Sequence, residues 1–194
     1  MDKVIGIVRD AGYKCQWKII SAHDAGAPQT RKRWFLLGYK NTPSVYNNTI
    51  INTLSYYKEL WKKEPVPRLL KYIPNQYTKR LKALGNSVVP LCALLAMHSL
   101  SGKEVENISK TYATIIIKDN NGNIIKTYNK WGTPCASVTQ PAHTFSSRFI
   151  GSLYTQMLYD SKSHKTSTKC HCNPEFVEWL QGYPIEWTKV DPST

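Results

Sequence analysis

Three polar side chains spaced two residues apart, Gln29, Arg31 and Arg33, form the part of this sequence best suited to chemistry. They follow a Gly-Ala-Pro turn and precede the apolar run Trp34–Leu37. On an extended backbone alternate side chains share a face, so all three are predicted to point the same way. Two guanidinium groups and a carboxamide on one face could bind phosphates and base edges. The alternative interpretation is a solvated basic loop that leads into a buried strand.

A second stretch, Gly85–Pro90, reads Gly-Asn-Ser-Val-Val-Pro. Together and in this order, the two stretches resemble the eighth and tenth motifs of the DNA (cytosine-5) methyltransferases. Residues 64–90 and the closing segment, residues 173–188, are similar to phage-type members of that family. The resemblance covers most of the chain, although residues 103–130 match nothing in it.

The resemblance implies a role for each motif residue. Arg33 matches the family arginine that contacts O2 of a flipped cytosine, where a cation stabilises the negative charge that builds on the ring. Arg31 matches the neighbour that braces phosphate and the nucleophile loop, and Gln29 would support both or be a turn residue. Asn86 and Ser87 are predicted to open a helix and close over the cofactor, S-adenosylmethionine. Asn86 could instead only cap that helix.

The blocks that carry the family's chemistry are absent from these residues. No Pro-Cys-Gln block, no Glu-Asn-Val block and no glycine-rich cofactor loop occurs in the sequence. The only Pro-Cys pair ends at Cys135, but alanine follows it and it lies after the last motif, so we do not interpret Cys135 as a nucleophile. Covalent catalysis cannot proceed without a nucleophile, so we expect the chain alone to be inactive.

We therefore expect the C-terminal half of a DNA (cytosine-5) methyltransferase. Completed by an N-terminal half, it would transfer a methyl group from S-adenosylmethionine, held jointly by both halves, to C5 of cytosine in double-stranded DNA. The alternative is a catalytically inactive DNA-binding remnant or regulator. A weaker alternative is an RNA-binding accessory protein.

Positive charge is concentrated in one part of the sequence. The formal net charge is +13, and residues 30–82 hold 12 of the 26 Lys and Arg but only two of the 13 acidic residues. Aromatic residues interleave with these cations, which favours a nucleic-acid face. The candidate nucleic-acid-binding residues are Arg31, Arg33, Lys62, Lys63, Arg68, Lys79, Arg80 and Lys82. Base reading would fall to residues 40–63 or to the region after Gly102.

Cysteine usage and apolar patterning bear on location. Five cysteines without a framework spacing favour a reducing compartment. Neither a signal peptide nor a membrane span is predicted, so we expect an intracellular protein of a bacterial or host cell. Its gene could be that of the cell or of a phage or virus. Cys170, His171 and Cys172, with His164, form one tight cluster where zinc sites need two ligand pairs, so no metal site is expected.

Apolar periodicity and turn residues predict an α/β fold. It would be a partial Rossmann-like methyltransferase sheet, made of edge strands and helices, with a small α+β appendage. We expect residues 1–102 to form the methyltransferase half and residues 103–194 the accessory region. Predicted helices cover residues 2–11, 54–63 and 87–100 and a segment after Asn173; predicted strands cover residues 14–21, 34–38, 111–119 and 124–130, the last two as a hairpin; residues 40–53 are predicted to be loop.

Overall fold

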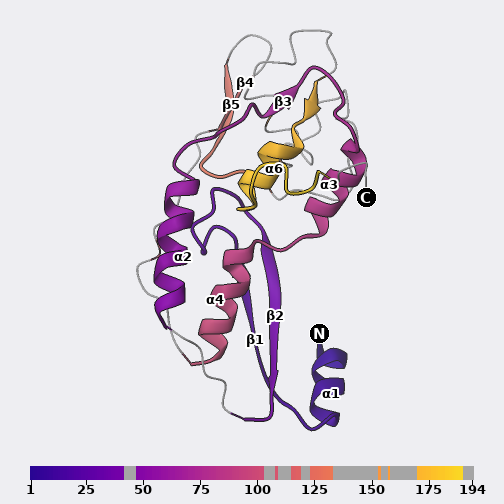
Figure 1. The fold of residues 1–194 in the computed structure, drawn as a ribbon, viewed down its shortest axis with the longest axis vertical. Helices are drawn as coiled ribbons and strands as arrows, with labels where there is room; N and C mark the ends of the chain where they lie inside the picture. Colours follow the sequence, from indigo (N-terminus) through magenta and orange to yellow (C-terminus); the bar gives the residue numbers. More distant parts are fainter. Residues whose placement is uncertain are drawn as a thin grey trace.

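The structure is a computed structural model that describes residues 1–41, 47–102, 108, 115–118, 123–132, 153, 157 and 170–189. This part of the chain has a mixed α/β fold with three two-stranded antiparallel sheets (Figure 1). The elements are α1 (Asp2–Asp10), β1 (Lys14–Ser21), β2 (Lys32–Tyr39), α2 (Asn47–Leu60), β3 (Leu69–Leu70), α3 (Tyr77–Asn86), α4 (Pro90–Leu100), β4 (Ile115–Lys118), β5 (Ile124–Tyr128), β6 (His171–Cys172) and α6 (Pro174–Leu180).

The N-terminal elements agree with the sequence prediction. Helix α1 ends before Gly12, which takes a left-handed φ of 81° that suits glycine. Strands β1 and β2 then pair antiparallel around the Gln-x-Arg-x-Arg loop, with Ile20 opposite Arg33. The pairing in this long ribbon confirms the expected strands and sets Arg33 at the loop end of β2.

Helix α4 lies between the β1–β2 ribbon and α2 (Figure 1). Its apolar residues pack on both sides, which buries Leu91, Cys92 and Leu95. Helix α2 begins at Asn47, so the prediction of a loop over residues 40–53 is wrong for its second part. Asparagine favours turns, but it is also a common residue at helix N-termini, and packing of α2 against α4 favours the helix.

The predicted helix over residues 87–100 is shorter than expected, and α3 precedes it. Ser87 and Val89 are extended, with ψ values of 169° and 118°. Proline disfavours a helical conformation at the residue before it, so Pro90 separates α3 from α4. By length and composition Tyr77–Leu100 could cross a membrane, but half of its apolar window is buried in the protein. The break at residues 87–89 and this burial are typical of a core segment.

The C-terminal residues that the structure describes pack into the core built by residues 1–102. Strand β6 pairs with β3, and the α6 residues Phe176, Trp179 and Leu180 are buried as expected. Asn173 caps α6 by accepting a 3.0 Å hydrogen bond from the backbone N–H of Glu175. The predicted hairpin forms as β4 and β5. The boundary expected at residue 102 therefore does not separate α6 from the helices before it.

Reciprocal indole hydrogen bonds join α6 to the end of α2. The Nε1 of Trp61 donates to the carbonyl oxygen of Trp179 at 3.0 Å, and the Nε1 of Trp179 donates to that of Leu60 at 2.9 Å. Tyr57 packs on Trp61 with ring centroids 5.0 Å apart. Buried indoles need such partners, and here each one also fixes a helix end.

Candidate functional site

Arg31 joins the two motif stretches inside the protein. Its side chain is 1% exposed, and Nη2 donates to the carbonyl oxygen of Gly85 at 2.9 Å and to that of Ser87. Hydrogen bonds from a charged donor are about twice as strong as neutral ones. The Arg31 side chain therefore contacts the backbone between α3 and α4. The phosphate contact expected from the sequence would require this side chain to leave its buried position.

Gln29 and Arg33 do not share the environment of Arg31. Gln29 is fully buried, and its Nε2 donates to the carbonyl oxygen of Leu180 at 2.9 Å. Arg33 is half-buried at the start of β2, and its Nη1 donates to the carbonyl oxygen of Lys32 at 2.9 Å. The expected common face therefore divides into two buried scaffold residues and one arginine that solvent can reach.

Asn86 and Ser87 close α3 instead of opening α4. Ser87 is the C-cap residue, and its Oγ lies 2.9 Å from the carbonyl oxygen of Leu84 and 2.7 Å from Oε1 of Gln181. The Ser87 hydroxyl is therefore occupied by protein groups. Asn86, the last residue of α3, is the member of this pair that is exposed to solvent.

Side chains from the C-terminal segment hold the same helix junction. Gln181 donates from Nε2 to the carbonyl oxygen of Leu84 at 2.6 Å, and the Tyr183 hydroxyl donates to that of Val88 at 2.7 Å. The last carbonyls of a helix lack partners within the helix, so these contacts satisfy groups that the break exposes. Sequence reasoning missed Gln181 and Tyr183, although the resemblance of residues 173–188 to the family was a usable signal.

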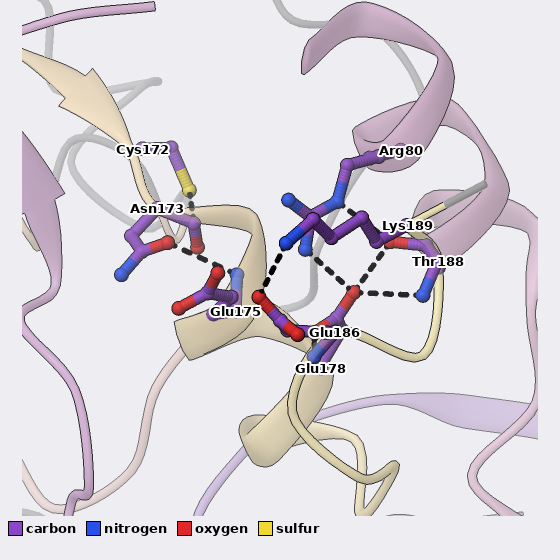
Figure 2. Close-up of polar contacts among 8 residues, drawn as sticks. All are labelled: Arg80, Cys172, Asn173, Glu175, Glu178, Glu186, Thr188 and Lys189. Carbon is purple, nitrogen blue, oxygen red and sulfur yellow. Dashed lines mark hydrogen bonds and ion pairs between the residues drawn. The ribbon is translucent and has the colours of Figure 1, made fainter. Parts of the chain in front are cut away.

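A buried ion pair fixes α3 to α6 (Figure 2). Nη2 of Arg80 lies 2.9 Å from Oε1 of Glu178, with the two side chains 5% and 0% exposed. Nε of Arg80 also donates to Oγ1 of Thr188 at 3.0 Å. Arg80 was predicted to bind nucleic acid, but this position turns it away from solvent. Glu178, which the sequence analysis did not single out, is its partner.

The remaining predicted cations differ in how accessible they are. Arg68 is partly buried, forms two hydrogen bonds with the Glu64 carboxylate, and lies 4.7 Å from the ring centroid of Trp131. Lys62 is exposed and pairs with Glu59 at 2.6 Å, a contact that salt readily screens. The exposed members are Lys62, Lys63, Lys79 and Lys82, which we call the four lysines.

The two buried cysteines among the described residues, Cys92 and Cys172, are not ready nucleophiles. Burial raises the pKa of the Cys92 thiol to about 12 and that of the Cys172 thiol to about 12. The thiolate is the reactive form, so both are protonated at neutral pH. Cys135, which we did not interpret as a nucleophile, lies outside the described residues.

The Cys-His-Cys sequence spans strand β6. Cys172 is buried with Sγ 3.9 Å from Sδ of Met157, whereas the His171 ring packs edge-on against Tyr77, 5.8 Å between centroids. Successive strand residues face opposite ways, so the His171 and Cys172 side chains lie on opposite faces of the strand. Within the described ranges, no three His, Cys, Asp or Glu side chains are grouped so that they could hold a metal ion.

A family model described as "C-5 cytosine-specific DNA methylase" matches residues 1–192. No curated protein and no solved structure matches the chain.

Proposed function

Because the chain belongs to the C-5 cytosine-specific DNA methylase family, we propose that it is the C-terminal half of a DNA (cytosine-5) methyltransferase. Completed by polypeptide that carries the missing motifs, it would methylate C5 of a flipped cytosine with S-adenosylmethionine as donor. The observation that carries this proposal is the Arg31–Gly85 hydrogen bond, which makes one rigid unit of the two motif stretches. Arg33 and Asn86 both extend from that unit.

Arg33 is the residue we assign to the base. Its neighbour Arg31 is committed to backbone carbonyls, which leaves Arg33 as the accessible guanidinium of this motif. A cation held there would stabilise the negative charge that develops on the cytosine ring when a thiolate of the completing polypeptide adds to C6. Lys32 lies beside it and is exposed, so the local potential favours an anion.

Asn86 is the residue we assign to the cofactor. Its carboxamide offers two donors and an acceptor at the exposed end of α3, which suits a polar ligand. Ser87 then acts as a positioning residue, since its hydroxyl is engaged by Leu84 and Gln181. S-adenosylmethionine supplies the methyl group when it binds. The sequence has no glycine-rich loop, so these residues form part of a site that other polypeptide must complete.

Exposed apolar surface near the N-terminus supports completion by further polypeptide. In the described part of the chain β1 and β2 pair only with each other, and no residue of α1 is buried. Val4, Ile7 and Ile19 are 46%, 60% and 52% exposed. Further polypeptide that packed against α1 and the face of this ribbon would cover them.

Reconstitution tests the proposal. The chain should be expressed with and without a polypeptide that carries the Pro-Cys-Gln, Glu-Asn-Val and glycine-rich blocks, and transfer of labelled methyl groups to duplex DNA measured. We expect transfer only from the combination, and Arg33→Ala should lower kcat by two or more orders of magnitude, about 2.7 to 4 kcal/mol. Transfer by the chain alone that Cys135→Ala abolishes would overturn the proposal.

The missing nucleophile also supports a second candidate, a catalytically inactive DNA-binding remnant or regulator. The exposed four lysines would serve either function. Methyl transfer by no combination, with salt-sensitive DNA binding retained, would favour this second candidate.

A further inference from the structure

An exposed indole projects from the turn segment that follows α6. The Trp187 side chain is 62% exposed and stacks on Tyr183, with ring centroids 5.7 Å apart and planes at 16°. Tyr183 is anchored in turn, because its hydroxyl donates to the carbonyl oxygen of Val88. The anchored Tyr183 ring therefore supports one face of the Trp187 indole, and the indole remains accessible to solvent.

The backbone that carries Trp187 is fixed by the buried Glu178 carboxylate (Figure 2). Glu178 accepts from the backbone N–H of Glu186 at 2.6 Å, and from the N–H and hydroxyl of Thr188 at 2.9 and 2.5 Å. Glu186 adopts a left-handed φ of 68°, a strained conformation for a non-glycine residue. These contacts hold a strained turn in place, and the turn presents an indole that could otherwise fold back onto the surface.

Basic side chains lie next to this turn. The 3.0 Å contact between Arg80 Nε and Thr188 Oγ1 brings the turn against α3. Lys79 is exposed on the same helix, and Lys189, two residues after Trp187, is exposed and pairs with Glu186 at 2.7 Å. An accessible aromatic ring beside lysines is the arrangement with which proteins bind nucleic-acid strands, because the bases stack and the cations follow the phosphates.

We propose that Trp187 is a stacking platform for a base that is outside the duplex stack. The proposal rests on the proposed function, because an enzyme that flips cytosine works on DNA with unpaired bases. A protein partner fits this surface less well. The exposed apolar residues of the turn are Trp187 and Ile185. Their combined surface is far smaller than the roughly 800 Å² that each partner buries in a stable interface.

Binding to two labelled duplexes tests the proposal, one fully paired and one of the same length with a single bulged base. Trp187→Ala should weaken binding to the bulged duplex by about 5- to 150-fold, the effect of losing one stacked base. Binding to the paired duplex should change less than twofold. Trp187→Phe should retain most of the preference for the bulge, since a smaller ring still stacks. Fluorescence anisotropy measures all six affinities, those of the wild type and the two variants for each duplex.

Two controls accompany these variants. Ile124→Ala removes another side chain that is 62% exposed, on β5, and should leave both affinities unchanged. Thr188→Val keeps Trp187 but removes a hydroxyl that donates to Glu178, so it should lower the preference for the bulge. Thermal melting of each variant checks that the fold is intact.

The outcomes separate this proposal from the one it rests on. If Trp187→Ala leaves bulge binding unchanged while the wild-type chain binds DNA in a salt-dependent way, the platform is wrong and the proposed function stands. An equal loss on both duplexes, or loss only of binding to the completing polypeptide, also contradicts the platform. A wild-type chain that binds neither duplex would contradict the platform, whereas the proposed function is decided by methyl transfer from the reconstituted combination.

Discussion

Arg31 donates a 2.9 Å hydrogen bond to the carbonyl oxygen of Gly85, a residue 54 positions further along the chain. The same nitrogen reaches the carbonyl oxygen of Ser87 on the other side of Asn86. An arginine is suited to this position because its rigid fork can satisfy several acceptors at once. The two motif stretches thus depend on each other for their conformation, and Arg31 supports the fold while Arg33 remains available for the base.

Removing the Arg31 side chain should therefore destabilise the protein. Arg31→Ala leaves the carbonyls of Gly85 and Ser87 buried without this donor, and hydrogen bonds to charged groups contribute about 1.5 to 3 kcal/mol. We expect the free energy of unfolding to fall by about 3 kcal/mol in urea denaturation followed by circular dichroism. Arg33→Ala is the matched control and should change it by less than about 0.5 kcal/mol. Equal losses would contradict the division of roles.

The Arg80–Glu178 ion pair predicts a larger effect. Glu178→Ala leaves the Arg80 charge buried without its carboxylate and removes the acceptor for Glu186 and Thr188. Breaking a buried pair from one side typically costs about 3 to 5 kcal/mol. Glu59→Ala removes the exposed partner of Lys62 and should cost at most about 1 kcal/mol. Similar unfolding midpoints for the two variants would show that burial does not determine the contribution of the pair.

Local patterns predicted the elements whose signals lie within a few residues. Strands β1 and β2 follow from apolar residues on both sides of one turn, and the end of α1 follows from Gly12. The break between α3 and α4 was predictable in principle, since Pro90 restricts Val89, but apolar periodicity over residues 87–100 outweighed it. Helix α2 packs against α4, a contact between residues distant in the sequence that no local pattern contains.

The candidate site was harder to predict because its contacts join distant residues. The spacing of Gln29, Arg31 and Arg33 gives their alternation, but the burial of the first two depends on Leu180 and Gly85. Charge alone could not separate Arg80, paired with a buried carboxylate, from the exposed Lys79 beside it. Long-range partners of this kind determine which cations can reach a ligand.

Two glycines with the same φ allow the cost of a left-handed conformation to be measured separately from the cost of steric crowding. Gly12 and Gly182 both have a φ of +81°, but a Cβ at residue 12 meets nothing within 4 Å. At residue 182 it would lie 2.5 Å from Cε1 of Tyr57. Gly12→Ala should cost about 1 to 2 kcal/mol for the left-handed conformation. Gly182→Ala should cost about 1 to 3 kcal/mol more, since neighbouring side chains must move. Equal melting temperatures would contradict this contact.

Three buried acids predict a loss of stability at alkaline pH. Burial raises the pKa of Cys92 and Cys172 from 9.0 to about 12, and that of Tyr57 from 10.0 to about 12. The unfolded chain loses these protons first, so stability is complete below pH 9 and falls as pH rises toward 12. Between these values each thiol contributes at most about 1.4 kcal/mol per pH unit. Melting temperature should drop between pH 9 and 11, and less steeply in Cys92→Ala; an identical slope would contradict the assignment.

DNA binding by the isolated chain should be weak, show little sequence preference and depend on salt through residues 30–82. Six of the eight predicted cations are at least partly exposed there: Arg33, Arg68 and the four lysines. If about four to six cations of this region contact phosphates, log K should fall against log salt with a slope of roughly −4 to −5.

Replacing Lys62, Lys63, Lys79 and Lys82 with glutamine should flatten this slope by about 3 to 4. Replacing Lys3, Lys14 and Lys126, which are exposed elsewhere, should change it by less than about 1. A larger effect of the second set would place the DNA face outside residues 30–82, and salt-independent binding would exclude a phosphate-binding face altogether.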